Sequence, residues 1–222
     1  MGKEQEDKTG TAREKAVQKE SEDYNIALEA IRNHHATQNT YSGKFLRPHV
    51  KYLKQIIEDY DIESILDYGC GKGLQYEWVF PPTPVMQDGS EIIMPEGMSI
   101  EQYWGQEVTK YDPGVPKFEA KPTGKYDLVL CTHVLGCIPL QDLRSWVLDE
   151  IFGYANKFVY IVEAIGKPKK NVIDYSKIEC PINYSPIKWL DLIAPHKPTD
   201  VTCELVCRYR SDVGTFTGRF RI

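Results

Sequence analysis

The chain of 222 residues contains no long apolar stretch. No run approaches the roughly 18 consecutive apolar residues that a membrane-spanning helix requires. The N-terminus also lacks the apolar core of a secretory signal peptide, which argues against export. We therefore expect a cytoplasmic protein with no membrane partner.

The chain also lacks the residue spacings that build a metal site. None of its six cysteines forms a Cys-x-x-Cys pair, and its five histidines are not spaced as partners for zinc. Cys203 and Cys207 lie in a strand-like run, where same-face residues four apart are about 13 Å apart and cannot share a metal. Cys70, Cys131 and Cys137 follow apolar strand patterns, in which cysteine behaves as a small hydrophobe. We expect reduced thiols and no metal.

An excess of basic residues is absent as well. The net charge is −5 and the pI is near 5.6, which argues mildly against a surface built for nucleic-acid phosphates. These totals do not address a local basic patch. Hydrophobic residues make up 41% and charged residues 27%, as in soluble globular proteins.

Composition along the chain predicts a disordered leader followed by one domain. Residues 1–20 mix Lys, Glu, Asp and Gln with almost nothing apolar, which is typical of disorder. The remaining residues, 21–222, suffice for a single domain with a substantial core. Within them, residues 81–104 carry Asp88-Gly89 and other turn residues between short apolar pieces. This segment predicts an inserted hairpin or lid.

Hydrophobic periodicity predicts alternating strands and helices. The predicted strands are residues 64–67, 107–111, 126–132, 157–162, 202–209 and 215–222. The predicted helices are residues 22–35, 48–60, 74–80, 140–154 and 187–193. Asp212 and Gly214 between the last two strands indicate an antiparallel hairpin. The pattern predicts an α/β fold with N-terminal helices and a doubly wound, mostly parallel sheet that ends in an antiparallel hairpin.

The glycine-rich loop after the first predicted strand is the most informative stretch, with residues 64–73 reading SILDYGCGKG. Gly69, Gly71 and Gly73 alternate, and glycine lets bare backbone approach a ligand because it has no Cβ and tolerates positive φ. Asp67 at the strand end favours a ligand with hydroxyls or a cationic group over one with phosphates. This combination indicates S-adenosylmethionine (SAM).

Two other nucleotide motifs fit the loop less well, and a third reading needs no ligand. A phosphate-binding P-loop requires Ser or Thr after its lysine, whereas Gly73 follows Lys72. A dinucleotide-binding loop requires Gly-x-Gly-x-x-Gly, whereas the spacing here is Gly-x-Gly-x-Gly. The third reading is a glycine-rich turn that only reverses the chain.

The ends of the predicted strands gather further polar residues. In open α/β sheets, ligands bind beyond the carboxyl ends of the strands. Asp67, Asp112, His133 and Glu163 end four different predicted strands and are therefore expected to converge. Asp112 is suited to accept hydrogen bonds from both hydroxyls of a ribose.

Three segments resemble motifs of class I SAM-dependent methyltransferases. Residues 65–73 resemble the first motif and residues 108–113 the second, whose acid binds the ribose. Residues 126–139, YDLVLCTHVLGCIP, resemble the fourth motif, which often contains Leu-Glu-His-Ile-Pro. The predicted terminal hairpin also matches that fold. The resemblance covers about residues 41–222 and implies a Rossmann-like fold with SAM as cofactor.

The resemblance also implies roles for individual residues. Gly69 and Gly71 contact the methionine half of SAM, Asp67 holds its ammonium group directly or through water, and Asp112 holds the ribose. The implied cofactor-binding set is Tyr41, Lys44, Asp67, Tyr68, Gly69, Cys70, Gly71, Asp112, Pro113, Phe118, Cys131, Thr132 and His133.

Three of these assignments have alternatives that the sequence leaves open. Tyr41 and Lys44 either close over the carboxylate of the cofactor or belong to a solvated linker. Phe118 packs either on the purine ring or in the core.

The fourth motif departs from its relatives, because Gly136-Cys137 stands where they often have Glu-His. His133 is then the best-placed candidate for a general base, and its alternative role is packing or capping at a strand end. SAM carries a good leaving group, so alignment of donor and acceptor can supply most of the catalysis. Glu163 either recognises a substrate ammonium or makes an ordinary strand-end hydrogen bond.

The leading hypothesis is a methyltransferase that acts on a small-molecule or sugar-like acceptor. A nucleic-acid methyltransferase is disfavoured because no Asp/Asn-Pro-Pro-Tyr-like motif follows the strand at 126–132, and Cys180-Pro181 reverses the Pro-Cys order. The other alternative is a non-catalytic SAM-binding or interaction protein. The oligomeric state stays open.

Overall fold

The computed structural model describes residues 24–26, 28–33, 36, 44–81, 96–138, 141–165, 184–211 and 214–222. The predicted leader at 1–20, most of the predicted insertion at 81–104 and Tyr41 lie outside the described residues.

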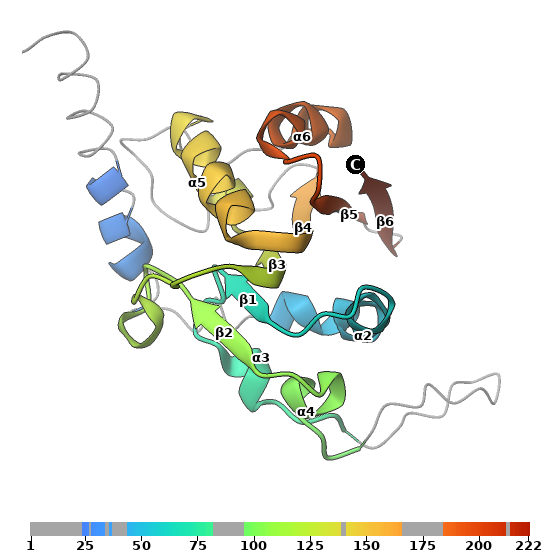
Figure 1. Ribbon diagram of the computed structural model, residues 1–222. Helices are drawn as coiled ribbons and strands as arrows, with labels where there is room; N and C mark the ends of the chain where they lie inside the picture. The colour runs from blue at the N-terminus through green and yellow to red at the C-terminus, as the bar shows by residue number, and fades with distance from the viewer. Residues whose placement is uncertain are drawn as a thin grey trace, which may run out of the picture.

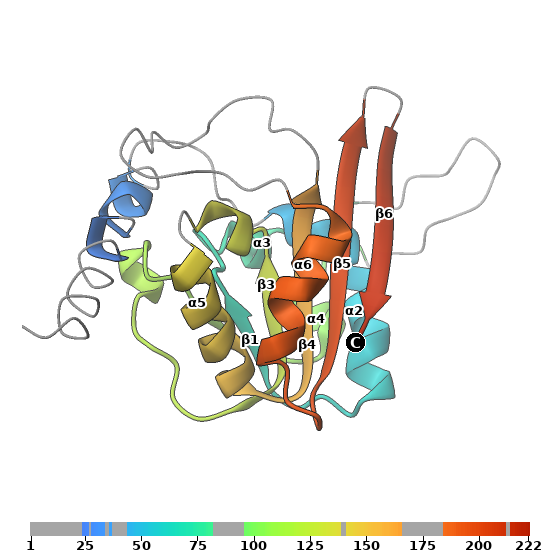
Figure 2. The same ribbon diagram turned by 90° about the horizontal axis from the view of Figure 1, so that it is seen from above.

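A six-stranded sheet in the order β2-β1-β3-β4-β5-β6 forms the centre of the fold. The strands are β1 Ile65–Tyr68, β2 Val108–Tyr111, β3 Tyr126–Thr132, β4 Ala155–Ile165, β5 Thr202–Ser211 and β6 Gly214–Arg221. All neighbouring strands are parallel except β6, which runs antiparallel to β5. Figure 2 shows this terminal hairpin at one edge of the molecule. The predicted α/β class, the mostly parallel sheet and the hairpin are confirmed.

Helices cover both faces of the sheet (Figure 1), with α5 and α6 on one face and α2 and α4 on the other. The α-helices are α2 Val50–Asp59, α3 Leu74–Glu77, α4 Ile100–Trp104, α5 Gln141–Tyr154 and α6 Pro186–Ile193. Short 3-10 turns are η1 Lys44–His49, η2 Pro116–Phe118, η3 Leu135–Cys137 and η4 Ala194–His196. Residues 24–26 and 28–33 are also helical. Among the described residues, no helix is long and apolar enough to cross a membrane.

The helix predicted over 48–60 begins two residues later than expected. Pro48 lies inside the 3-10 turn η1, and the α-helix α2 starts only at Val50. Its buried face consists of Val50, Leu53, Ile56 and Ile57. The apolar spacing identifies this face but does not separate a 3-10 turn from the first turn of an α-helix.

The predicted insertion at 81–104 has a hairpin base and a helical end. The Phe80 amide donates to the carbonyl of Met98 at 2.9 Å, and the Gly97 amide donates to the carbonyl of Phe80 at 3.0 Å. Residues 100–104 instead form α4, whose Trp104 is buried. The Trp104 indole donates to the carbonyl of Val50 at 2.9 Å. The end of this segment therefore belongs to the core rather than to a lid.

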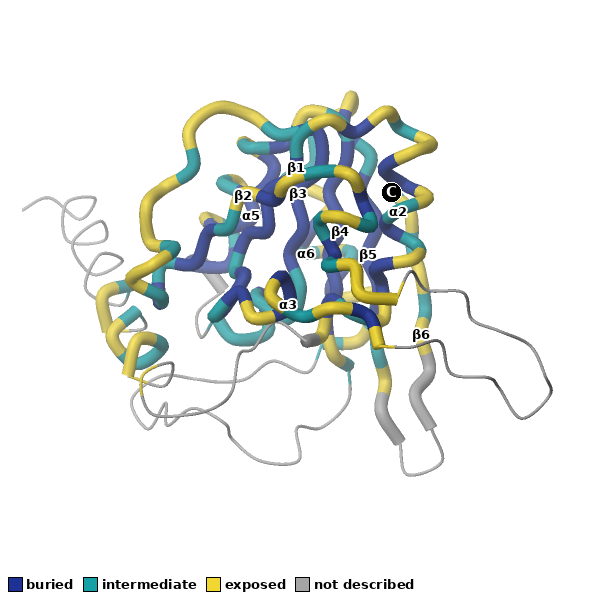
Figure 3. Tube along the Cα trace, turned by 90° about the horizontal axis from the view of Figure 1, so that it is seen from below, coloured by how far each residue is buried: buried dark blue, intermediate teal, exposed yellow. Residues whose placement is uncertain are grey.

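The central strands are buried on both faces, which explains why residues 126–132 are nearly continuously apolar. Leu128 and Leu130 join the hydrophobic cluster under α2 and α4. Val129 and Cys131 join the cluster under α5 and α6. Figure 3 shows the resulting buried centre, with exposed loops around it.

Candidate functional site

The glycine loop between β1 and α3 requires glycine at specific positions. Gly69, Gly71 and Gly73 have φ values of 79°, 60° and 68°, all in the left-handed region. A Cβ on Gly69 would lie 2.2 Å from Val134 Cγ2, and one on Gly73 would lie 2.8 Å from Phe118 Cε2. Two of the glycines are therefore required by internal packing as well as by their backbone conformation.

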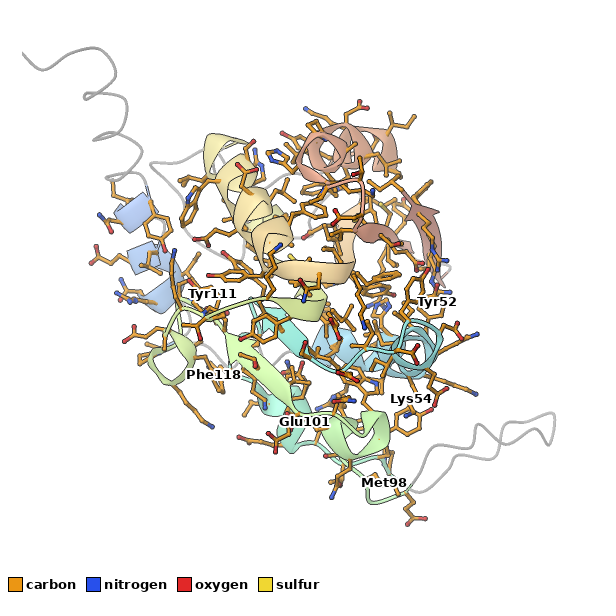
Figure 4. All side chains as sticks on the ribbon, viewed as in Figure 1. Tyr52, Lys54, Met98, Glu101, Tyr111 and Phe118 are labelled. Atoms are coloured by element: carbon orange, nitrogen blue, oxygen red, sulfur yellow. The ribbon has the colours of Figure 1, made fainter. Side chains whose placement is uncertain are left out.

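Asp112 ties the glycine loop to the end of β2. Its Oδ2 accepts a hydrogen bond from the Gly71 amide at 2.9 Å, and its Oδ1 accepts one from the Gly114 amide at 2.8 Å. The Gly69 amide donates to the carbonyl of Tyr111 at 2.7 Å, just before Asp112. Figure 4 labels Tyr111 and Phe118 on this side of the molecule. Asp112 organises the loop, so ribose hydroxyls would share oxygens that already accept backbone hydrogen bonds.

Asp67 is almost completely buried, at 1% exposure, below the glycine loop. Its Oδ2 accepts hydrogen bonds from the Tyr76 hydroxyl at 2.8 Å and from Gln75 Nε2 at 3.0 Å. Burial raises the pKa of Asp67 to about 6, although these two bonds lower it. No described residue donates to its other oxygen, Oδ1. An ammonium donor would satisfy this buried acceptor.

His133 follows β3 in a strained backbone conformation. Its φ is 59°, which is uncommon for a residue other than glycine and is often found at functional sites. The imidazole packs on Phe45 with ring centroids 4.5 Å apart, and no described residue bonds its Nε2. Burial, assisted by the charge of Arg208, lowers the pKa of His133 to about 4. The imidazole is therefore neutral at pH 7 and can accept a proton, but it is a weak base.

Glu163 holds the turn that follows His133. Its Oε1 accepts a hydrogen bond from the Leu135 amide at 2.8 Å, and its Oε2 accepts one from the Gly136 amide at 3.2 Å. A Cβ on Gly136 would lie only 2.9 Å from Glu163 Oε2. This contact leaves little room for a side chain at position 136 while Glu163 holds its present conformation. Of the two roles expected for Glu163, the geometry favours the strand-end hydrogen bond.

The side chains of three expected cofactor-binding residues point into the interior. Cys131 is fully buried in the core, and Cys70 is buried with its Sγ 3.4 Å from the carbonyl of Gly71. The Tyr68 hydroxyl donates to Glu150 Oε2 at 2.7 Å, below the α5 face. Because these side chains are buried, any ligand contact at the three positions would come from the main chain.

The remaining expected residues are half-buried or lie outside the described part of the chain. Pro113 and Thr132 are half-buried at the ends of β2 and β3. Phe118 is half-buried with its ring against Gly73, and it belongs to neither of the two core clusters of the described residues. The Lys44 side chain, like Tyr41, lies outside the described residues.

Two cavities open beside the terminal hairpin, the first against η1 and the second against α2. The first measures about 450 Å³ and is lined by Pro48, His49, Arg208, Thr217 and Arg219. The second measures about 460 Å³ and is lined by Tyr52, Gln55, Ile56, Asp59, Tyr60 and Arg221. Figure 4 labels Tyr52 in this region. The sequence analysis did not identify these residues, because they come from segments that only the fold brings together.

Comparison of the chain with protein-family models, curated proteins and solved structures finds no match. Within the described part of the chain, no group of three or more His, Cys, Asp or Glu side chains is arranged to hold a metal ion.

Proposed function

We propose that the chain is a SAM-dependent methyltransferase that acts on a small-molecule or sugar-like acceptor. The main support for this proposal is the loop at the carboxyl end of β1, in which three glycines have left-handed backbone conformations. Asp112 accepts a hydrogen bond from the Gly71 amide in this loop, and Asp67 is buried in β1 just before it. Such a loop gives a ligand access to backbone, and both neighbouring carboxylates favour cationic or hydroxylated groups. In open α/β sheets this edge is where ligands bind.

In this proposal, different residues of the chain bind different parts of SAM. Asp67 would attract the ammonium group of SAM through its Oδ1, while Asp112 would face the ribose. SAM, when bound, supplies a methyl group activated by a sulfonium leaving group. The two acids leave negative charge next to this cation, which favours its binding.

His133 is the residue placed to take a proton from the methyl acceptor. It lies at the end of β3, next to the turn that Glu163 holds. Its neutral imidazole can accept the proton that a hydroxyl or amine loses when its oxygen or nitrogen is methylated. Because the imidazole is a weak base, alignment of donor and acceptor would supply most of the rate.

Calorimetric titration with SAM and S-adenosylhomocysteine tests cofactor binding. We expect both to bind with one site per chain. Failure of both to bind would overturn the proposal. Incubation with labelled SAM and a metabolite extract then tests turnover, and we expect a labelled small product. Label found only in protein or nucleic acid would overturn the proposed acceptor class.

A non-catalytic SAM-binding protein is the second candidate. It is favoured by the pKa of about 4 for His133 and by the backbone hydrogen bonds that engage Glu163. Binding of SAM without any labelled product would support this candidate over the enzyme.

A further inference from the structure

The cavity next to η1 is lined by cations with few acids opposite them. Arg208 is half-buried, and it forms no hydrogen bond or ion pair with another described residue. Arg219 Nε lies 3.8 Å from Glu204 Oε1, a long contact for an ion pair. The same Glu204 accepts a much shorter bond, 2.9 Å, from Arg221. The charge of Arg208 therefore has no ion-pair partner among the described residues, whereas that of Arg219 is partly balanced by Glu204 and by the Tyr52 ring, which its guanidinium contacts at 3.8 Å.

The strand register explains why these two arginines share one cavity. In the antiparallel β5–β6 pair, Arg208 lies opposite Thr217, and Val206 lies opposite Arg219. Val206 is buried in the cluster under α2, and residues two apart on a strand share a face. Arg208 and Arg219 thus project from neighbouring strands toward η1 and α2.

His49 adds a buried polar group to the same cavity wall. Its exposure is 3%, its Nδ1 lies 2.9 Å from the Tyr160 hydroxyl, and its Nε2 has no partner among the described residues. Burial, together with Arg208, His133 and Arg219, lowers the pKa of His49 to about 3. A buried polar atom and a half-buried guanidinium in one cavity are arranged for an anion that accepts hydrogen bonds.

The cavity adjoins His133 through a single short segment. Phe45 in η1 packs on the His133 ring, and Pro48 and His49 at the other end of η1 line the cavity. Arg208 acts electrostatically on both His133 and His49. A ligand held by Arg208 would therefore lie against η1, the turn whose Phe45 packs on the candidate proton acceptor.

We propose that this cavity binds an anionic group of the methyl acceptor, either a phosphate ester or a carboxylate. The acceptor assignment rests on the proposed function, whereas anion binding itself does not. Arginine suits both groups because its planar guanidinium donates two parallel hydrogen bonds to paired oxygens. The acceptor would thus be a small anionic metabolite, complementary in charge to a cationic cofactor.

Titration with inorganic phosphate, and separately with acetate, tests the anion site at constant ionic strength. We expect at least one of the two to saturate the wild-type protein and to shift the His49 imidazole resonances in NMR spectra. Saturation by phosphate assigns a phosphate ester, and saturation by acetate alone assigns a carboxylate. If neither anion saturates the protein, the proposal is wrong.

Variants locate the binding within the cavity. Arg208→Gln should weaken the affinity for the binding anion about tenfold, because it removes a charge-assisted hydrogen bond. Arg219→Gln should act in the same direction. Lys51→Gln, an equal charge change at an exposed position of α2, should leave the affinity unchanged. Wild-type affinity in a folded Arg208→Gln variant, checked by circular dichroism, would overturn the assignment.

SAM titration of the same proteins separates this inference from the proposed function. We expect Arg208→Gln to bind SAM as the wild type does. If SAM binds but neither anion does, the anion site is wrong and the methyltransferase proposal stands. If an anion binds through Arg208 but SAM does not, the assignment to a methyl acceptor is wrong.

Discussion

Charged side chains have different surroundings at the two ends of the edge where the parallel strands finish. At the glycine-loop end, Asp67 and Asp112 are buried, and each accepts hydrogen bonds from protein donors. At the hairpin end, Arg208 and Arg219 line a cavity with little compensation from acids. Hydrogen bonds within the protein hold the acids at the glycine-loop end, whereas the hairpin end brings the two positively charged arginines close together. Buried or clustered charges that a fold leaves uncompensated are candidates for ligand binding.

The same contrast matches the two proposed ligands. The acidic end suits a cationic cofactor, and the basic end suits an anionic acceptor. The following substitutions disturb one end or the other. Gly69→Ala at the glycine-loop end should lower the free energy of unfolding, whereas Arg208→Gln at the hairpin end should raise it.

Gly69→Ala should have the largest effect, on the glycine-loop end. The new Cβ would meet Val134 Cγ2 at 2.2 Å, and Val134 Cβ, which rotation of the side chain does not move, would lie only 3.3 Å away. We expect the free energy of unfolding to fall by about 3 kcal/mol in urea denaturation. Gly124→Ala is the control, with a φ of +84° but no neighbour within 4 Å. It should cost only about 1 kcal/mol, and equal losses would show that Val134 does not constrain the loop.

Glu163 should make the protein less stable as the pH rises. Burial raises the pKa of Glu163 to about 8, so the folded state binds its proton more tightly than the unfolded state does. Its contribution is complete below its ordinary pKa and is lost as the pH rises toward 8. Between pH 6 and 8 we expect a loss on the order of 2 kcal/mol, measured by denaturation at each pH.

Glu163→Gln tests the source of this pH dependence. The variant should have a flatter stability profile between pH 6 and 8, whatever its absolute stability. Asp67, with a pKa of about 6, titrates mainly below this window. An unchanged slope in the variant would assign the pH dependence to other groups.

Asp112→Ala should weaken SAM binding by about 1–3 kcal/mol in calorimetry, because charge-assisted hydrogen bonds are lost. Asp112→Asn is the matched variant, since it retains one acceptor oxygen for the Gly71 or Gly114 amide, and it should lose less. Unchanged SAM affinity in Asp112→Ala would show that the ribose does not bind at this residue.

Arg208→Gln should have the smallest effect on stability, and in the opposite direction. It removes a cation near His49 and Arg219 without breaking a hydrogen bond to any described residue. We expect stability to rise by about 0.5 kcal/mol in thermal denaturation. Lys51→Gln should change stability by less. A clear loss of stability in Arg208→Gln would show that this arginine supports the fold rather than a ligand.

Much of the fold follows from local pattern. The strand predicted over 126–132 is β3 to the residue, and the helix predicted over 48–60 contains α2. Residues 100–104 were expected in a hairpin or lid, but they form α4 because Trp104 packs in the core and bonds the carbonyl of Val50. That contact joins segments distant in the chain, and no local sequence pattern predicts it.

The candidate site was predictable in its residues but not in their partners. The positive φ of Gly69, Gly71 and Gly73 agrees with the conformational freedom expected from the sequence. The cofactor contacts proposed for Asp67 and Asp112 stay predictions. Their internal partners, such as Tyr76 for Asp67, depend on how α3 folds back onto β1. Sequence spacing alone does not show which acceptor a buried hydroxyl reaches.

The sequence by itself determined the order of strands and helices, the hairpin at the end of the chain and the loop that only glycine can form. These features are local, since they depend on side-chain periodicity and on the φ angles that each residue tolerates. Only the tertiary structure placed Arg208, Arg219 and His49 around one cavity next to η1, whose Phe45 packs on His133. Strand register and the packing of η1 against the sheet bring these charges together, and neither can be read from residues so far apart in the chain.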